Sequence, residues 1–286
     1  MRDPAVSDRA LDLVALVTGA GGGIGRALVA RLLALGARVA ASDVSLAALE
    51  SLPGPEERLL RLALDVRDPA GWEAALAAVE ARWGTPDALY NVAGFLRPGR
   101  VWDLSPADAA LHLDVNVKGV ILGTRVVGAA MRARGRGHVI NVGSLAGLAP
   151  IPGLALYSAS KFAVRAFSLA AAQELTGSGV AVTVVCPDAV QTPMLDLQVE
   201  HEEAALTFSG PRVLSAEEVA RTLAGRVLRR RPLEVWIPSS RGWLARAADL
   251  FPGAAGLLRG ALVRKGRLRQ QARRAPGAME APPPPG

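Results

Sequence analysis

The chain has 286 residues, of which 50% are hydrophobic, 21% charged and 4% aromatic. This hydrophobic share excludes an intrinsically disordered protein. The length suits one α/β domain with an appendage, or two small domains. Its single cysteine, Cys186, excludes a disulfide framework, and its three scattered histidines indicate no metal site. The formal net charge is +7, but residues 226–286 hold 13 basic residues against three acidic ones, so the positive excess belongs to the C-terminal tail.

Short apolar runs alternate along the chain with longer segments whose apolar residues recur every three to four positions. In chain order we expect strand 13–18, helix 24–35, strand 38–42, helix 46–52, strand 59–64, helix 70–83 and strand 88–92. A long helix over 106–134, strand 138–142, helix 156–175, strand 180–185, helix 216–230 and strand 233–237 follow. Helices of this length between strands require crossover connections, so the sequence predicts a doubly wound parallel sheet of Rossmann type.

The predicted organisation is one catalytic domain over residues 13–238, preceded by a short segment, 1–12. Residues 188–214 lack a clear period and are expected to form a substrate lid. A basic, amphipathic helical extension over 239–275 and a flexible proline-rich end over 276–286 complete the chain. No export signal is recognisable, and charges and a proline interrupt the apolar stretch 243–263, so we expect a cytoplasmic location.

A glycine-rich segment leads from the first strand into the first helix. Glycines without a Cβ let a pyrophosphate approach the backbone, and the helix start offers free N–H groups and a positive dipole. The spacing Gly19-x3-Gly23-x-Gly25 differs from the general G-x-G-x-x-G fingerprint. We interpret this segment as a dinucleotide site, with a plain glycine-rich turn as the alternative. The binding candidates are Gly19, Gly23, Ile24 and Gly25.

Two aspartates close the second and third strands. Asp43 is placed to accept hydrogen bonds from the adenosine ribose and to repel a 2′-phosphate, which favours NAD over NADP as the cofactor. The alternative is that Asp43 only caps the following helix. Asp65, followed by Val66, is a candidate for contact with the adenine, and an acidic turn residue is its alternative interpretation.

Tyr157 and Lys161 lie four residues apart at the start of a predicted helix, so their side chains share a face. Such a pair also arises by chance, but the chain has only two tyrosines and three lysines beside 30 arginines. An ammonium near a phenol lowers the pKa of the phenol, so Tyr157 is a candidate general acid and base. Ser144, at the end of the preceding strand, is placed to orient a substrate oxygen. Asn116 is a polar residue among apolar neighbours, for which a structural and a functional role are equally favoured.

These residues together resemble a classical short-chain dehydrogenase/reductase over roughly 13–238. Thr18–Gly25 is similar to the family's TGxxxGxG loop, Asn91–Gly94 to its NNAG motif, and Pro187–Thr192 to its PGxVxT segment. The resemblance implies that Asn116, Ser144, Tyr157 and Lys161 form the catalytic tetrad, in which Tyr157 transfers the proton, Ser144 holds the substrate oxygen, Lys161 also binds the nicotinamide ribose and Asn116 positions a water. It further implies cofactor contacts from Tyr157 as well as Lys161, and from a set of motif residues: Asn91, Ala93, Gly94, Pro187, Val190 and Thr192.

Two positions depart from the family's motifs. Val92 replaces the second asparagine of NNAG, which leaves the Ala93–Gly94 backbone shape intact. Asp188 stands where the family usually has glycine, which affects the local turn and the resting position of the lid. Neither change removes a group of the expected tetrad.

The expected substrate is a small lipophilic alcohol or ketone, because the candidate pocket residues are all apolar. They are Leu96, Leu145, Leu148, Ile151, Leu154, Met194, Leu195 and Leu197. Residues 243–274 alternate apolar residues with arginine, a pattern that suits either an amphipathic helix on an anionic membrane or a solvated or intersubunit helix. We expect a homodimer or homotetramer and no nucleic-acid partner. The alternative function is a nonenzymatic, dinucleotide-sensing protein whose basic tail binds nucleic acid or membrane, although the tail lacks interleaved aromatic residues.

Overall fold

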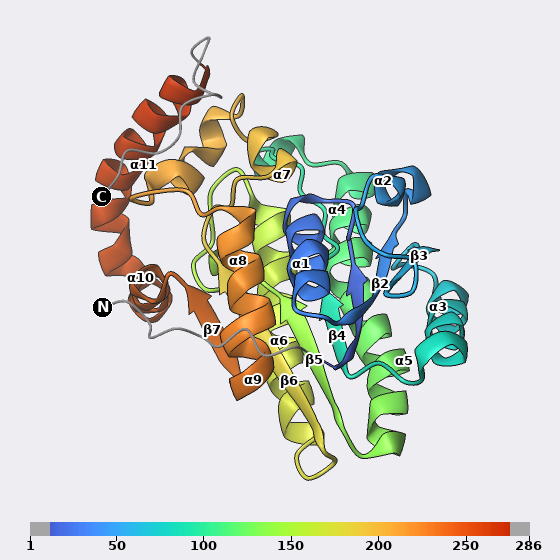
Figure 1. Cartoon of the computed structure of the whole chain (residues 1–286). Coiled ribbons are helices and arrows are strands. Elements are labelled where there is room, and N and C mark those ends of the chain that lie inside the picture. Colours follow the sequence, from blue (N-terminus) through green and yellow to red (C-terminus); the bar gives the residue numbers. More distant parts are fainter. Residues whose placement is uncertain (1–11, 275–286) are drawn as a thin grey trace.

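The computed structural model describes residues 12–274, apart from the side chains at 254, 255, 258 and 259. Seven parallel strands form one sheet in the order β3-β2-β1-β4-β5-β6-β7 (Figure 1). The predicted doubly wound α/β fold is confirmed, and each predicted strand is present to within two residues at either end. The strands are β1 (Val14–Thr18), β2 (Arg38–Asp43), β3 (Leu59–Ala63), β4 (Ala88–Asn91), β5 (Gly137–Val142), β6 (Val180–Pro187) and β7 (Glu234–Ile237).

Helices cover both faces of the sheet because successive side chains of a strand point to opposite sides. Ala15 and Val17 of β1 belong to the apolar cluster formed with α1 (Gly23–Ala34), α2 (Leu46–Glu50) and α8 (Ala216–Thr222). Val14 and Leu16 belong to the cluster on the other face, formed with α3 (Pro69–Trp83), α5 (Gly119–Arg134) and α6 (Ala155–Glu174). The central strands are therefore buried on both faces, as continuous apolar runs predict.

The order of strands reverses between β1 and β4, and the loops that follow these two strands meet at their carboxyl ends. The Thr18 hydroxyl at the end of β1 accepts hydrogen bonds from the backbone N–H groups of Val92 and Ala93, both at 3.1 Å. In doubly wound sheets such a reversal opens a crevice where ligands bind. The hydrogen bonds from Thr18 fix the two loops that form this crevice.

Two long predicted helices contain a π turn each. The helix expected over 106–134 consists of α4 (Pro106–Leu113), the π turn η2 (Asp114–Lys118) and α5. The one expected over 216–230 consists of α8, the π turn η5 (Leu223–Val227) and the short α9 (Leu228–Arg230). A π turn adds one residue to the helical repeat without interrupting the apolar pattern, so periodicity alone does not reveal it, and such turns are frequent at functional sites.

The predicted lid contains two short helices, α7 (Pro193–Asp196) and η4 (Glu202–Ser209), and the C-terminal extension forms α10 (Ser239–Leu250) and α11 (Pro252–Arg274). The amphipathic pattern over 243–274 is therefore split in two, because the helical dihedrals end at Phe251 and Pro252 begins a new helix. α11 runs along the edge of the molecule beside the lid (Figure 1). The remaining short turns are η1 (Val101–Asp103) and η3 (Leu145–Gly147). The predicted proline-rich end and, except for Asp12, the predicted N-terminal segment lie outside the described residues.

Candidate active site

The loop between β1 and α1 fits a pyrophosphate. Gly19 has φ +64°, and a Cβ on it would lie 2.7 Å from the Cα of Ala93. A Cβ on Gly25 would lie 2.1 Å from the carbonyl oxygen of Gly19, so neither position accepts a side chain. Gly22 precedes α1 without a side-chain cap, which leaves the first N–H groups of α1 available to an anion. A large cavity opens beside this loop at the carboxyl ends of the strands. Four residues predicted to bind a dinucleotide line it: Gly19, Gly23, Ile24 and Gly25.

Asp43, Asp65 and Val66, the residues predicted to lie near the adenosine, line the cavity beside the glycine loop. One oxygen of the Asp43 carboxylate accepts from the backbone N–H of Gly21 at 3.0 Å, and the other accepts from that of Ser45 at 3.1 Å. Asp43 therefore fixes the glycine loop and also begins the turn into α2. The Asp65 carboxylate is bound to the Arg67 guanidinium, with a shortest distance of 2.6 Å, and this pairing lowers the pKa of Asp65.

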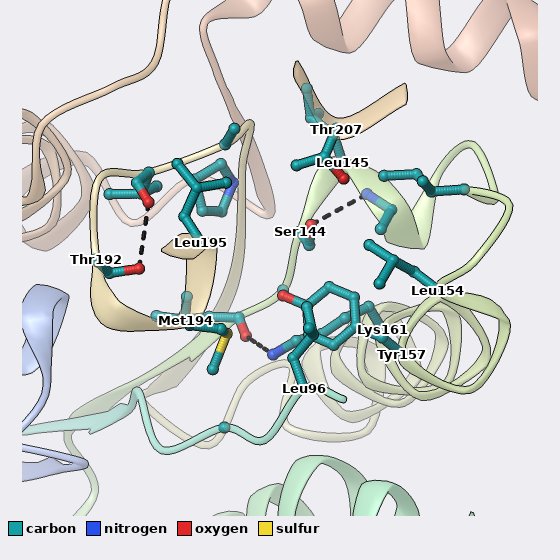
Figure 2. A pocket seen from close by; sticks show the side chains of 18 of the residues that line it. Leu96, Ser144, Leu145, Leu154, Tyr157, Lys161, Thr192, Met194, Leu195 and Thr207 are labelled. Carbon is teal, nitrogen blue, oxygen red and sulfur yellow. Dashed lines mark hydrogen bonds between the residues drawn. The ribbon is translucent and has the colours of Figure 1, made fainter. Parts of the chain in front are cut away.

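Ser144, Tyr157 and Lys161 converge in the same cavity, beyond the glycine loop (Figure 2). Tyr157 and Lys161 lie one turn apart on α6, and the Lys161 ammonium is 5.6 Å from the centre of the Tyr157 ring. The Lys161 Nζ donates to the carbonyl oxygen of Val142 at 2.9 Å, which ties α6 to the end of β5. Ser144 lies two residues after the end of β5, and its hydroxyl accepts from the N–H of Ala146 at 3.1 Å. A proton carrier, a hydroxyl and a cation thus share one buried site.

Burial dominates the protonation of this site. It raises the pKa of Tyr157 to about 12, and the hydrogen bond with Ser144 opposes that rise only in part. Burial lowers the pKa of Lys161 to about 8. In the protein without its cofactor the loss of water around the phenol outweighs the hydrogen bond with Ser144, so the expected lowering of the Tyr157 pKa is not seen there. Tyr157 is a protonated acid at neutral pH.

The two asparagines predicted for the site lie behind the cavity and do not line it. Asn116, on the π turn η2, accepts from the N–H of Phe95 at 2.7 Å, and its amide donates to the Phe95 carbonyl and to the Ser160 hydroxyl, both at 2.9 Å. Its side chain is fully engaged in holding the loop after β4. Asn91 donates to the Asn141 side chain at 2.8 Å.

Asn141 in turn donates to the Ser168 hydroxyl on α6 at 2.9 Å. This buried chain of hydrogen bonds fixes β4, β5 and α6 relative to each other. Asn141 and Ser160 were not predicted to serve the site, and the only signal for Asn141 is a polar side chain inside an apolar strand.

Pro187, Val190 and Thr192 line the cavity together with Ala93 and Gly94. The Thr192 hydroxyl donates to the Val190 carbonyl at 3.2 Å. A Cβ on Gly23 would lie 2.4 Å from the Thr192 methyl, so the segment after β6 packs directly on the glycine loop.

The part of the cavity beyond Tyr157 is lined mainly by apolar side chains, and the whole cavity measures about 720 Å³. Leu96, Leu154, Met194 and Leu195 surround Ser144 and Tyr157 in Figure 2. Leu145 and Ile151 also line it, as predicted. The prediction that Leu148 and Leu197 line the pocket is wrong. Leu148 is fully buried in a core cluster with Val184 and Cys186, and Leu197 is 56% exposed, so neither lines the cavity.

The C-terminal extension contributes a wall of the cavity that the sequence did not predict. It supplies Leu244, Ala245, Ala248, Pro252, Gly256 and Leu262. No motif signals these residues, because their part in the cavity depends on where α10 and α11 fold back against the lid.

The model of the short chain dehydrogenase family matches residues 13–203. A 2-(R)-hydroxypropyl-CoM dehydrogenase from Xanthobacter autotrophicus is 35% identical over 66% of this chain and 79% of that protein. A 3-alpha-(or 20-beta)-hydroxysteroid dehydrogenase from Mycobacterium bovis is 37% identical over 67% of this chain and 74% of that protein. The crystal structure of a 3-ketoacyl-(acyl-carrier-protein) reductase from Brucella melitensis with NADH superposes with a TM-score of 0.71 at 27% identity, over 81% of this chain and 98% of that one. The chain therefore belongs to the short chain dehydrogenase family and is an oxidoreductase that uses a nicotinamide dinucleotide, NAD or NADP, on alcohol or ketone substrates.

Proposed function

We propose that this enzyme interconverts lipophilic secondary alcohols and ketones, that it prefers NAD, and that Tyr157 is its general acid and base. The observation that carries the proposal is the position of Ser144, Tyr157 and Lys161, which stand between a glycine cradle and a cavity lined mainly by apolar side chains. Arg241, which lines the apolar part of the cavity, is paired with Asp188, so Lys161 beside Tyr157 supplies the positive charge at this part of the site.

In this proposal the substrate oxygen lies between the hydroxyls of Ser144 and Tyr157. The bound nicotinamide supplies hydride to the carbonyl carbon, or accepts it from the carbinol carbon in the reverse direction. In reduction the Tyr157 hydroxyl gives its proton to the oxygen as the C–O bond becomes single, and in oxidation the phenolate takes that proton back. Lys161 stabilises the phenolate through its positive charge, and the apolar walls exclude water.

The preference for NAD rests on Asp43. Its carboxylate lines the cavity at the adenosine end, where it would repel a 2′-phosphate. The nearby arginines are already engaged, because Arg26 donates to the Ala48 carbonyl at 2.8 Å and Arg67 is paired with Asp65. A 2′-phosphate would therefore meet a negative charge and no uncommitted cation among these residues.

We expect the wild-type enzyme to bind NAD more tightly than NADP, and Asp43→Ala to narrow or reverse that preference. Asp43→Asn is the sharper variant, because it removes the charge but keeps an oxygen for the N–H of Gly21. The ratio of the two Kd values is expected to change on the order of tenfold, since two unit charges 4 Å apart repel by about 1 kcal/mol even in water. Fluorescence titration of both cofactors measures it. Tighter binding of NADP to the wild type would contradict the role of Asp43.

The substrate class is tested by a panel of secondary alcohols and ketones of increasing apolar size, including aliphatic alcohols and hydroxysteroids, followed by the change of NADH absorbance. We expect kcat/KM to rise with apolar size. Cofactor binding with no turnover of any member would instead favour the alternative of a dinucleotide-sensing protein without enzymatic activity. A homodimer or homotetramer stays a prediction, which sedimentation equilibrium tests.

We further propose a peripheral contact with the inner face of an anionic membrane, in a protein located in the cytoplasm. Apolar side chains stand out around the junction of α10 and α11, where Trp243 is 67%, Phe251 66% and Leu257 86% exposed. The outer face of α11 adds exposed basic residues such as Arg264 and Arg267. This combination suits the surface of an anionic bilayer. Within residues 12–274, no helix is both long and apolar enough to span a bilayer.

We expect the full chain to sediment with anionic liposomes at low salt and to be released as salt increases, because each basic residue at the surface contributes about 1 kcal/mol before screening. The double variant Phe251→Ser, Leu257→Ser should bind on the order of tenfold more weakly, since it loses two apolar side chains from the contact. Trp102→Ser, which removes an aromatic side chain that is 77% exposed on η1, is the control and should bind normally. Equal binding by both variants, or none by the wild type, would contradict the contact.

A further inference from the structure

The inner face of α11 packs against the segment 193–209, which forms the roof of the substrate cavity and is called the roof below. Gln270 is the central contact, with only 1% of its surface exposed. Its amide nitrogen donates to the backbone carbonyls of Gln198 and His201, both at 2.8 Å. One buried side chain of the C-terminal extension thus binds two carbonyls of the roof, each of which also accepts a backbone N–H within the roof, from His201 and Ala204.

Further contacts surround Gln270 along the same face of α11. One turn before it, a Cβ on Gly266 would lie 2.0 Å from the carbonyl oxygen of Ala205, so the two backbones touch. One turn after it, the Arg274 guanidinium donates to the Val199 carbonyl at 2.9 Å. Arg273 lies over the ring of Phe208, 5.9 Å from its centre. The last turns of α11 are therefore fitted to the roof between residues 198 and 208.

A second connection ties the extension to the start of the lid. Asp188, the residue that departs from the family's glycine, accepts from Arg241 of α10 at 2.8 Å. Both side chains are mostly buried, at 11% and 19% exposure, and Arg241 also donates to the hydroxyl of Ser209 at 3.4 Å. Asp188, which replaces the family's glycine, and Arg241 of the C-terminal extension thus form one contact.

The residues held by these contacts face the substrate. Met194, Leu195, Gln198, Leu206 and Thr207 of the roof line the cavity, and the extension supplies its outer wall. Gln270 lies at 1% exposure behind this layer and does not line the cavity itself. It can influence catalysis only through the roof.

We propose that Gln270 is a positioning residue for substrate binding, and that α11 latches the roof so that it closes over the distal apolar part of an extended substrate. The substrate class in this inference rests on the proposed function. The contacts that form the latch do not depend on it. A short alcohol beside Ser144 and Tyr157 meets only the start of the roof, at Met194 and Leu195. A longer apolar chain also lies against Leu206, in the part of the roof that α11 holds, and needs that part in place. The latch therefore acts on selectivity for length and leaves the chemical step unchanged.

The first experiment compares Gln270→Leu with Gln271→Leu in the full chain, because Gln271 is the exposed neighbour of Gln270 on the same helix. With saturating NAD, Gln270→Leu is expected to raise the KM for 2-octanol on the order of tenfold, as two buried hydrogen bonds are lost. The KM for 2-butanol, both kcat values and the Kd of NAD should change less than about twofold. Gln271→Leu should match the wild type. A merely structural role would impair both alcohols alike, and that result, or equal behaviour of the two variants, would overturn the proposal.

The second experiment needs no substrate. Gly266→Ala and Gly260→Ala both favour the helical state of α11, since alanine is the better helix former. Only at Gly266 does the new methyl meet the roof, because nothing lies within 4 Å of a Cβ on Gly260. Hydrogen exchange of the backbone amides in 197–204 should be faster in Gly266→Ala and Gln270→Leu and unchanged in Gly260→Ala and Gln271→Leu.

The two experiments separate the two proposals. If the wild type oxidises neither alcohol, the proposed function fails for these substrates while the exchange of residues 197–204 still decides the latch. Faster exchange in both latch variants supports the latch. Unchanged exchange in both overturns it, whatever the activity.

Discussion

Replacing Tyr157 by phenylalanine is expected to lower turnover by about 10² to 10⁴-fold, the usual contribution of a general acid or base. The substitution removes one oxygen and leaves the ring in its partly buried position on α6. Because this oxygen is not part of the glycine cradle, the Kd of NAD should stay within about twofold of the wild type. Steady-state kinetics and cofactor titration on the same preparation measure both values.

The chain offers a matched control in its other tyrosine. Tyr90 on β4 is fully buried in the core, and its hydroxyl has no hydrogen-bond partner among the described residues. Tyr90→Phe therefore removes the same atom from a ring that lies in the core outside the cavity, and it should leave kcat unchanged. A Tyr157→Phe enzyme with near-normal kcat on any substrate would refute the assignment of the general acid and base.

Lys161→Met is expected to reduce kcat/KM by about 10² to 10³-fold, the range typical of a lost electrostatic contact in an active site. The variant loses the charge that stabilises the Tyr157 phenolate and the group proposed to bind the nicotinamide ribose. The Kd of NAD should therefore rise as well, which distinguishes this variant from Tyr157→Phe. Lys265→Met, at an exposed position on α11, is the control and should leave kcat/KM unchanged.

The same substitution should stabilise the fold. Burial lowers the pKa of Lys161 from 10.5 to about 8, so between these pH values the unfolded chain binds a proton that the folded protein does not. The free energy of unfolding of the wild type therefore rises with pH across this window, and the penalty for burying the ammonium is complete below pH 8.

We expect Lys161→Met to be more stable below pH 8 by about 2 to 3 kcal/mol, the value of such a pKa difference less the lost hydrogen bond to Val142. The advantage should disappear as pH approaches 10.5. Urea unfolding at pH 7 and at pH 10 measures it. An equal or lower stability at pH 7 would show that the ammonium is not desolvated as described.

The sheet and the order of its elements could be predicted from the sequence because each apolar run has the length and period of one element. Tyr157, Lys161 and Ser144 could be placed together because they lie on one helix and on the strand just before it. The protonation of Tyr157 could not be predicted, since it depends on how completely the fold removes water from the phenol. The presence of a lysine near the tyrosine in the sequence does not tell how much water the fold removes from the phenol.

The outer part of the site was missed for a different reason. Leu148 and Leu197 are leucines, as are the pocket residues Leu145 and Leu195, so the residue type alone does not tell which of the four line the cavity. The wall formed by α10 and α11 depends on contacts between segments that are distant in the sequence, such as the one between Gln270 and Gln198. Neither residue type nor spacing announces such a contact.

The position of α11 on its own roof also bears on how the enzyme responds to dilution. The latch and the roof belong to one chain, and α10 and α11 are joined by a single residue, Phe251. Their effective concentration relative to each other is therefore set by the fold and does not fall when the protein is diluted. A roof completed by a neighbouring subunit would open as the oligomer dissociated. Here each subunit carries its own latch, so the proposed closure over the substrate does not depend on the number of subunits with which it assembles.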